Sequence, residues 1–175
     1  MLSGRVPPAA ASCLAARVPQ SGVLELFAGT GSLSLECLSR GAARALCVES
    51  SARYAGYVKE NVRSSGLDAE RLQVRVQDAY VAIHQLAEAG LTFDLVFADP
   101  PYGEKNQGRR STSHAQRLLD NLHLPSVLAT GGYLILGHAR RDTLTLPDER
   151  WHERKCLRHG DSVMRFLEKR NLKAT

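Results

Sequence analysis

Glycines or a carboxylate follow each of four short apolar runs in the chain. They are Gly29, Thr30 and Gly31 after residues 23–27, Glu49 after 45–48, Asp78 after 72–76 and Asp99 after 93–98. In open parallel sheets, ligands bind at the carboxyl ends of the strands. If the four runs are parallel strands, these residues share one edge of the sheet, and we expect a ligand-binding site there.

The first two of these strand ends have the residue types of a nucleoside site. A glycine turn lets the backbone approach a ligand that a side chain would block. Glu49 follows Gly29 by 20 residues, a spacing typical of a βαβ nucleotide site, where a carboxylate accepts hydrogen bonds from the ribose hydroxyls. A dinucleotide site would need a third glycine where Ser34 stands, and Glu25 would lie near any phosphate. A nucleoside with a positive centre and no phosphate fits better, and S-adenosylmethionine is such a ligand.

The segment Asp99-Pro100-Pro101-Tyr102 is the most specific signal in the chain. Two prolines cannot donate ladder hydrogen bonds, so the strand must stop there. Asp99 and the Pro100 carbonyl then offer two acceptors for one exocyclic amino group, and Tyr102 offers a flat face on which a base can stack. An isolated segment of this kind is most often an ordinary turn, but its place behind the glycine turn and two carboxylates favours a base-binding site.

Alternating strands and helices must position these residues. The pattern predicts helices over residues 32–40, 51–65, 78–88 and 114–129, the last kinked or split at Pro125, with Ser32 and Asp78 as helix caps. Three further strands are expected at residues 133–137, 151–157 and 162–167. The predicted fold is α/β: a doubly wound, mostly parallel seven-stranded sheet with a C-terminal antiparallel hairpin. We divide the chain into a short N-terminal arm, 1–22, and one domain, 23–175.

Composition narrows the class of protein. The 175 residues are 43% hydrophobic and 23% charged, ordinary values for one globular domain, and no run approaches the roughly 20 apolar residues of a membrane span. Four scattered cysteines without a CxxC pair suit a reduced, cytoplasmic compartment. The six histidines show no ligand spacing, so we expect no metal, and we expect a monomer.

The net charge of +5 is concentrated at one end of the chain. Residues 150–175 hold eight basic and three acidic residues, and the remainder is balanced. A basic patch attracts polyanions, although it can also be a solvated surface. Lys105, Arg109 and Arg110 follow Tyr102 closely, and we expect them to border the target pocket and contact RNA phosphates, with the C-terminal charge extending that surface.

Several of these segments match a known family. The segments ELFAGTG from Glu25, CVES with Glu49, VQDA with Asp78, and ADPPY resemble the amino-methylating class I S-adenosylmethionine-dependent methyltransferases. The chain is most similar to the bacterial 16S ribosomal RNA guanine-N2 methyltransferases, through the run LSRGA after the glycine turn and Gly160-Asp161 before the last strand. The resemblance extends over residues 23–167.

The resemblance implies a role for each matching residue. The residues that would hold the methionine part of the cofactor are Glu25, Phe27, Ala28, Gly29, Thr30 and Gly31. Glu49 would bind the ribose with Ser50 beside it, and Asp78 and Ala79 would contact the adenine. Asp99, Pro100, Pro101 and Tyr102 would hold the target base. The implied partner is ribosomal RNA or the small ribosomal subunit.

Other functions remain open at this point. The same motif serves methylation of DNA adenine, transfer RNA guanine or protein glutamine, although the last usually has Asn in place of Asp99. An NAD-dependent oxidoreductase would need the missing third glycine. A non-enzymatic RNA-binding module would need aromatic and basic clusters on a sheet face, and aromatic residues are only 6% of the chain.

Overall fold

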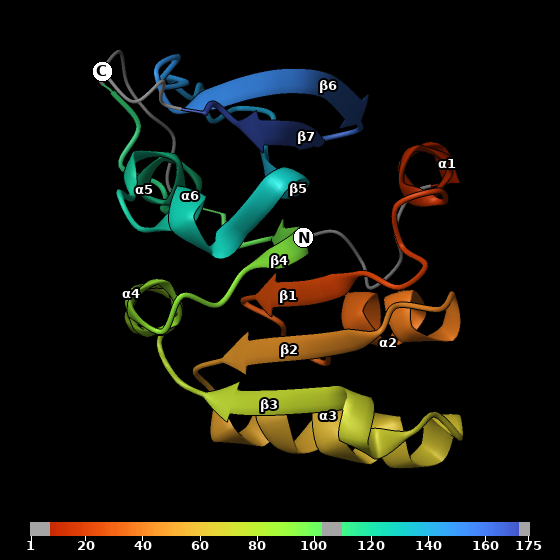
Figure 1. The fold of residues 1–175 in the computed structure, drawn as a ribbon. Helices are drawn as coiled ribbons and strands as arrows, with labels where there is room; N and C mark the ends of the chain where they lie inside the picture. The colour runs from red at the N-terminus through yellow and green to blue at the C-terminus, as the bar shows by residue number, and fades with distance from the viewer. Residues whose placement is uncertain (1–7, 103–109, 172–175) are drawn as a thin grey trace.

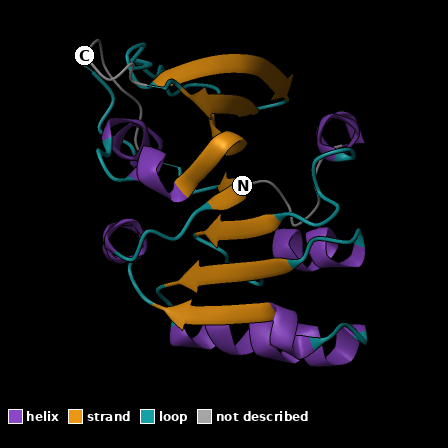
Figure 2. Ribbon diagram, viewed as in Figure 1, coloured by secondary structure: helices purple, strands orange, loops and turns teal. Residues whose placement is uncertain are grey.

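The computed structural model describes residues 8–102 and 110–171. Within them, seven strands form one sheet in the order β3-β2-β1-β4-β5-β7-β6 (Figures 1 and 2). The strands are β1 (Gly22–Leu26), β2 (Arg44–Glu49), β3 (Leu72–Val76), β4 (Phe93–Ala98), β5 (Leu128–Ala139), β6 (Trp151–His159) and β7 (Ser162–Lys169). Strands β1 to β5 pair only in parallel with one another, whereas β7 pairs antiparallel with both β5 and β6. The predicted sheet with its C-terminal hairpin is confirmed.

Helices cover both faces of the sheet, and the sheet separates the core into two clusters. The helices are α1 (Pro8–Leu14), α2 (Ser32–Ser39), α3 (Ala52–Ser65), α4 (Ala79–Glu88), α5 (His114–Asp120) and α6 (Leu124–Val127), with a 3₁₀ turn at Ala69–Arg71. One cluster packs α4, α5 and α6 against the sheet, and the other packs α1, α2 and α3. Figure 1 shows α4–α6 gathered on one side and α1 and α2 on the other.

The parallel strands direct their carboxyl ends to one edge, as the arrowheads of β1, β2 and β3 show in Figure 1. Leu24 lies in register with Leu46 on β2 and with Val96 on β4, so the neighbouring strands end at nearly the same level. All three side chains are almost fully buried. Burial on both faces explains why these strands are continuous apolar runs. The four segments that follow β1, β2, β3 and β4 therefore lie along this one edge of the sheet.

The predicted helix 114–129 is split in two, but the break lies at Asn121 and not at Pro125, and the second part ends at Val127. The helix ends at Asp120, because Asn121 adopts an extended backbone and its side chain accepts two backbone hydrogen bonds from the next turn. A short second helix follows, with Pro125 in its first turn. Strand β5 then begins at Leu128, five residues before the predicted start at 133. Leu128 is in register with Phe93 and Tyr133 with Leu95, so residues 129–132 form an irregularity in the β4–β5 pairing, where a Cβ atom on Gly132 would lie 2.6 Å from the Asp94 carbonyl oxygen.

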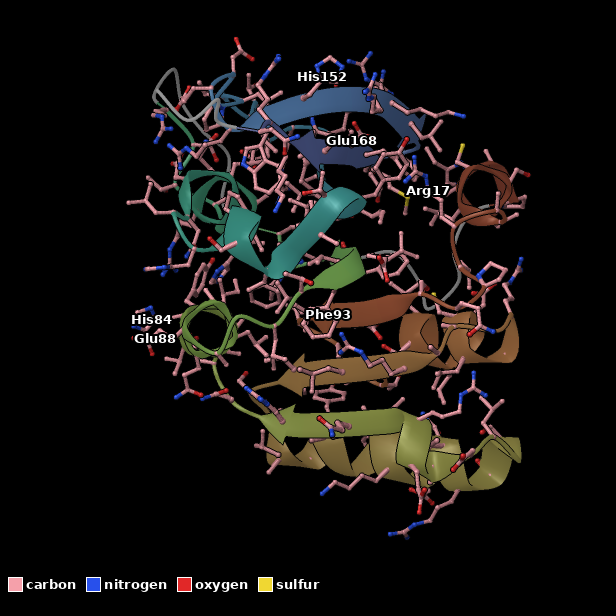
Figure 3. All side chains as sticks on the ribbon, in the orientation of Figure 1. Arg17, His84, Glu88, Phe93, His152 and Glu168 are labelled. Atoms are coloured by element: carbon pink, nitrogen blue, oxygen red, sulfur yellow. The ribbon has the colours of Figure 1, made fainter. Side chains whose placement is uncertain are left out.

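The residues before β1 also pack onto this sheet. Ala10, Leu14 and Val18 belong to the core cluster that contains α2 and α3. The Arg17 guanidinium lies 3.7 Å from the centre of the Tyr133 ring and 3.8 Å from the Glu168 carboxylate on β7. Figure 3 shows Arg17 and Glu168 near each other between α1 and β7. No helix among the described residues is long and apolar enough to cross a membrane.

Candidate functional site

A turn with three residues in the left-handed backbone region connects β1 to α2. The φ angles are 54° at Phe27, 57° at Gly29 and 73° at Gly31. A bulky residue with such a φ is a strained outlier, and strain of this kind gathers at functional sites. Gly31 is the N-cap of α2, so the prediction that Ser32 caps this helix is wrong. A Cβ atom on Gly31 would lie 2.8 Å from Val58 Cγ1, which explains the glycine there.

Glu25 is a buried carboxylate near the carboxyl end of β1. Its Oε2 atom accepts hydrogen bonds from Ser34 Oγ at 2.6 Å and from Ser34 N at 2.9 Å. Burial raises the pKa of Glu25 to about 7, against the lowering effect of the Ser34 hydrogen bonds. Since Glu25 also lines the cavity described below, its negative charge is costly unless a cation binds nearby.

Glu49 ties the end of β2 to the glycine turn. Its Oε2 atom accepts a hydrogen bond from Gly29 N at 2.7 Å, and its Oε1 atom accepts one from Ser51 N at 3.0 Å. Ser51 is the N-cap of α3, and its hydroxyl accepts a hydrogen bond from Tyr54 N. Each carboxylate oxygen has a second lone pair. Glu49 can therefore hold the turn and still accept hydrogen bonds from a ligand.

The segment after β4 is held by β7, which lies two strands away in the sheet. Tyr102 and Ser162, the first residue of β7, have their hydroxyl oxygens 2.7 Å apart. Pro100 is buried, Asp99 is partly buried and Tyr102 is half-buried. The C-terminal hairpin thus fixes the position of the Tyr102 ring.

The β1–α2 turn, Glu25, Glu49 and the segment after β4 all line one cavity. Its volume of about 580 Å³ is typical of small-ligand sites. Its lining residues from the predicted site are Glu25, Phe27, Ala28, Gly29, Thr30, Glu49, Ser50, Asp99, Pro100, Pro101 and Tyr102. The structure therefore brings together the residues expected at the ends of β1, β2 and β4. Ser32, Leu33 and Tyr54 also line the cavity, although the sequence analysis did not select them. The only signal for Tyr54 was its place on the first turn of the helix that follows Glu49.

Three predicted cofactor residues, Gly31, Asp78 and Ala79, are not among the residues that line this cavity. Asp78 is exposed and caps α4, as predicted, by accepting hydrogen bonds from Tyr80 N at 2.9 Å and Val81 N at 3.1 Å. Ala79 is buried at the start of that helix.

Of the predicted RNA contacts, only Arg110 lies within the described residues; Lys105 and Arg109 lie outside them. Arg110 forms a two-pronged ion pair with Asp120, with both N–O distances 2.7 Å. Its guanidinium is therefore directed at α5. Among the described residues, no group of three or more His, Cys, Asp or Glu side chains could hold a metal ion.

The strand order and the cavity at the carboxyl ends of β1, β2 and β4 define the class I methyltransferase fold. Among solved structures, an Escherichia coli protein described as a "Putative methyltransferase yhhF" is 24% identical with a TM-score of 0.70, covering 91% of this chain and 81% of that one. A structure described as "a putative methyltransferase complexed with SAH" is 17% identical with a TM-score of 0.73, covering 87% and 46% of the two chains.

The chain belongs to the family described as "Conserved hypothetical protein 95", whose model matches residues 3–168. It is 32% identical over 117 residues to the "Putative rRNA methyltransferase YlbH" of Bacillus subtilis, covering 67% of this chain and 59% of that protein. It is 31% identical over 120 residues to a ribosomal RNA large subunit methyltransferase K/L of Aeromonas hydrophila, covering 67% and 16%. The chain thus spans less than two thirds of the length of each of these two relatives.

Proposed function

We propose that this protein transfers a methyl group from S-adenosylmethionine to the exocyclic N2 amine of a guanine in small-subunit ribosomal RNA. The observation that carries the proposal is the single cavity that joins the carboxylates Glu25 and Glu49 to the segment Asp99–Tyr102. A nucleoside cofactor and an extruded base would then meet in one space. The ribosomal RNA target follows from the resemblance in the sequence and from the name of the Bacillus relative.

The residues present fit S-adenosylmethionine. Glu49 has acceptor capacity for ribose hydroxyls beside the Gly29 turn. The cationic end of the ligand would lie near Glu25, whose buried carboxylate such a charge would stabilise. When bound, S-adenosylmethionine supplies an electrophilic methyl group on a sulfonium, and the protein supplies alignment.

Asp99 and the Pro100 carbonyl would bind the N–H groups of the target amine. The lone pair of an exocyclic amine is delocalised into the base, so the amine is a weak nucleophile. Two fixed acceptors raise the electron density on that nitrogen as positive charge develops during transfer. Tyr102 would stack on the base, which has to leave its helix or be unpaired to reach this edge. Alignment of the amine with the methyl group would contribute further to the rate. As the N–C bond forms, the S–CH3 bond would break to leave S-adenosylhomocysteine, and Asp99 would accept the proton that the methylated amine loses.

A second candidate is an amine in large-subunit ribosomal RNA. It is favoured by the name of the Aeromonas relative, although this chain covers only 16% of that protein. The two candidates use the same chemistry at Asp99–Tyr102 and differ in the RNA that is presented to the cavity.

The test is transfer of radioactive methyl groups to unmodified transcripts of both ribosomal RNAs, with assembled subunits from cells lacking the gene as a parallel substrate. The RNA is then digested to nucleosides, and the methylated nucleoside is identified by mass spectrometry. We expect N2-methylguanosine in the small-subunit RNA or particle, and its formation should be slower by on the order of 100- to 1000-fold with an Asp99→Ala variant. Label in large-subunit RNA would support the second candidate. Label in another base, or no transfer to any RNA, would overturn the proposal.

A further inference from the structure

Tyr54 is an aromatic residue of the cavity to which the proposed function gives no role. It lies on the first turn of α3 and lines the cavity beside Glu49 and Ser50. Tyr54 is 49% exposed. Exposure alone is ordinary for a tyrosine, but a large exposed ring within the lining of a ligand cavity indicates a contact with the ligand.

The other aromatic rings of the cavity are placed elsewhere. Among the described residues that line it, these are Phe27 and Tyr102. The Phe27 ring packs with rings of α4 and α5, its centre lying 6.2 Å from that of Tyr80 and 5.4 Å from that of His114. Tyr102 follows β4 and belongs to the target segment. Tyr54 is thus the aromatic ring on the β2 side of the cavity, next to the expected ribose site.

Hydrogen bonds fix the first turn of α3 to the strand end before it. Ser51 N donates to Glu49 Oε1 at 3.0 Å, and the Ser51 hydroxyl accepts a hydrogen bond from Tyr54 N. Further along the helix, Asn61 Nδ2 donates to the Thr30 carbonyl oxygen at 3.2 Å, which holds α3 against the glycine turn. The backbone of Tyr54 is therefore positioned by the same carboxylate that is expected to bind the ribose.

The ring of Tyr54 keeps a face for a ligand. Its one aromatic contact among the described residues is with Tyr57, where the ring centres are 6.0 Å apart and the planes meet at 72°. A T-shaped contact of this kind covers at most one face of a ring. With 49% of the residue exposed, at least one face of Tyr54 stays open to a flat partner.

The covalent structure of the cofactor decides which part of it would meet Tyr54. Adenine and the sulfonium arm are attached to the ribose on either side of the ring oxygen, so they leave the ribose in different directions. Transfer to an amine at Asp99 requires the sulfonium to lie toward β4. Because β1 separates β2 from β4, the ends of these two strands are about 10 Å apart. With the ribose at Glu49, the adenine extends away from β4, toward Tyr54.

We propose that the ring of Tyr54 is the face on which the adenine of the cofactor stacks. This inference rests on the S-adenosylmethionine part of the proposed function and is independent of the RNA target. The predicted adenine contacts Asp78 and Ala79 are not among the residues that line the cavity, whereas Tyr54 is. A purine and a tyrosine ring are both flat π-systems, so they can stack without any hydrogen bond.

The first experiment measures binding of S-adenosylhomocysteine to the full chain by calorimetry. Loss of one base–aromatic stack weakens binding by about 5- to 150-fold, and this is the loss expected for Tyr54→Ala. Tyr54→Phe keeps the ring and should bind with nearly the wild-type affinity. Wild-type affinity in Tyr54→Ala would overturn the proposal. An equal loss in Tyr54→Phe would also contradict it, because the hydroxyl and not the ring would then make the contact.

A matched control removes a second tyrosine from the same helix. Tyr57 is 37% exposed and is not among the described residues that line the cavity. Tyr57→Ala should therefore bind S-adenosylhomocysteine with nearly the wild-type affinity. Equal losses in Tyr54→Ala and Tyr57→Ala would show that the helix, and not a ring in contact with adenine, determines the affinity.

A second measurement locates the contact directly. In the complex with S-adenosylhomocysteine, nuclear Overhauser effects are recorded from protein with isotope-labelled tyrosine, and the Tyr54 signals are assigned by their absence in Tyr54→Phe. We expect effects between the Tyr54 ring protons and H2 or H8 of the adenine. Effects only to the homocysteine chain, or none to the ligand, would refute stacking even if the Tyr54→Ala affinity falls.

The outcomes also separate this inference from the proposed function. If the wild type binds S-adenosylhomocysteine and Tyr54→Ala binds it as tightly, only the role of Tyr54 is wrong. If the wild type does not bind it, the proposed function loses its cofactor and the inference fails with it. If the wild type and the variants bind as expected but the wild type methylates no RNA, the RNA target is wrong and the role of Tyr54 is supported.

Discussion

The two halves of the cavity are held by contacts of very different range. On the β1–β2 side, Glu25 binds Ser34, nine residues away, and Glu49 binds Gly29, 20 residues away. On the β4 side, the contact that fixes Tyr102 comes from Ser162, 60 residues away. The first half is thus built within one βαβ unit, whereas the second is complete only after the C-terminal hairpin has folded against β5.

This difference suggests two separable tasks. A locally built half can bind a cofactor independently of the hairpin, whereas the half that depends on the hairpin can hold the target base and its flanking backbone. Variants in the first half should therefore change cofactor affinity, and variants in the second should change transfer to RNA. The predictions below test that separation.

The largest expected effect is on transfer, at Asp99. Loss of one preorganised acceptor costs on the order of 100- to 1000-fold in rate. Asp99→Ala should therefore lose most methyl transfer and keep its affinity for S-adenosylmethionine, measured by calorimetry. Asp99→Asn, which keeps one acceptor oxygen, should fall between the wild type and Asp99→Ala. Near-normal turnover in a folded Asp99→Ala protein would rule out the proposed role.

The next effect is on stability, at Glu25. Because burial raises the pKa of this carboxyl to about 7 from an ordinary 4.5, the folded state holds the proton more tightly than the unfolded state. The tighter binding of this proton adds to the free energy of unfolding; that addition is complete below pH 4.5 and is lost as the pH rises through 7. The shift corresponds to on the order of 3 kcal/mol.

Glu25→Gln stays neutral and keeps an acceptor for Ser34. Relative to this variant, the wild type should lose stability between pH 5 and pH 9, measured by urea unfolding in the absence of ligand. If the free energy of unfolding changed equally with pH in the two proteins, ionisation of the Glu25 carboxyl would not be the cause of the loss of stability.

Glu49 should affect the cofactor. Two lost hydrogen bonds of roughly 0.5–1.5 kcal/mol each correspond to about 5- to 150-fold weaker binding of S-adenosylmethionine by Glu49→Ala. At saturating cofactor the rate should recover, unlike that of Asp99→Ala. Glu60→Ala, an exposed position on α3, is the control. An unchanged dissociation constant for Glu49→Ala would refute the ribose assignment.

The same difference in range explains what the sequence could predict. Local patterns were enough for the apolar runs of β1–β4, the turn at Gly29 and the carboxylate Glu49, because their partners lie in the same or the next element. The break after Asp120 was missed because it depends on a side chain of Asn121 that caps the next turn. The early start of β5 was missed because the residues before Tyr133 pair irregularly with β4, and no local pattern shows that pairing.

Cavity residues show the same limit. Tyr54 was missed because a tyrosine on the first turn of a helix has no distinctive spacing, and only the fold brings it to Glu49 and Ser50. Arg110 was expected at the target pocket from its closeness to Tyr102 in sequence. Its ion pair with Asp120 on α5 could not be read from that spacing.

The smallest and most discriminating prediction concerns the long-range contact itself. Ser162→Ala removes the hydrogen bond to Tyr102, which is worth roughly 0.5–1.5 kcal/mol, so transfer to RNA should slow about 2- to 12-fold. Tyr102→Phe removes the same bond from the other side and should slow transfer by a similar factor. The double variant should be no slower than either single variant, because the two residues share one interaction. Binding of S-adenosylmethionine should be normal in all three. If the two losses multiply in the double variant, Ser162 acts on the rate through something other than Tyr102, and the hairpin does not position the target half of the cavity through this contact.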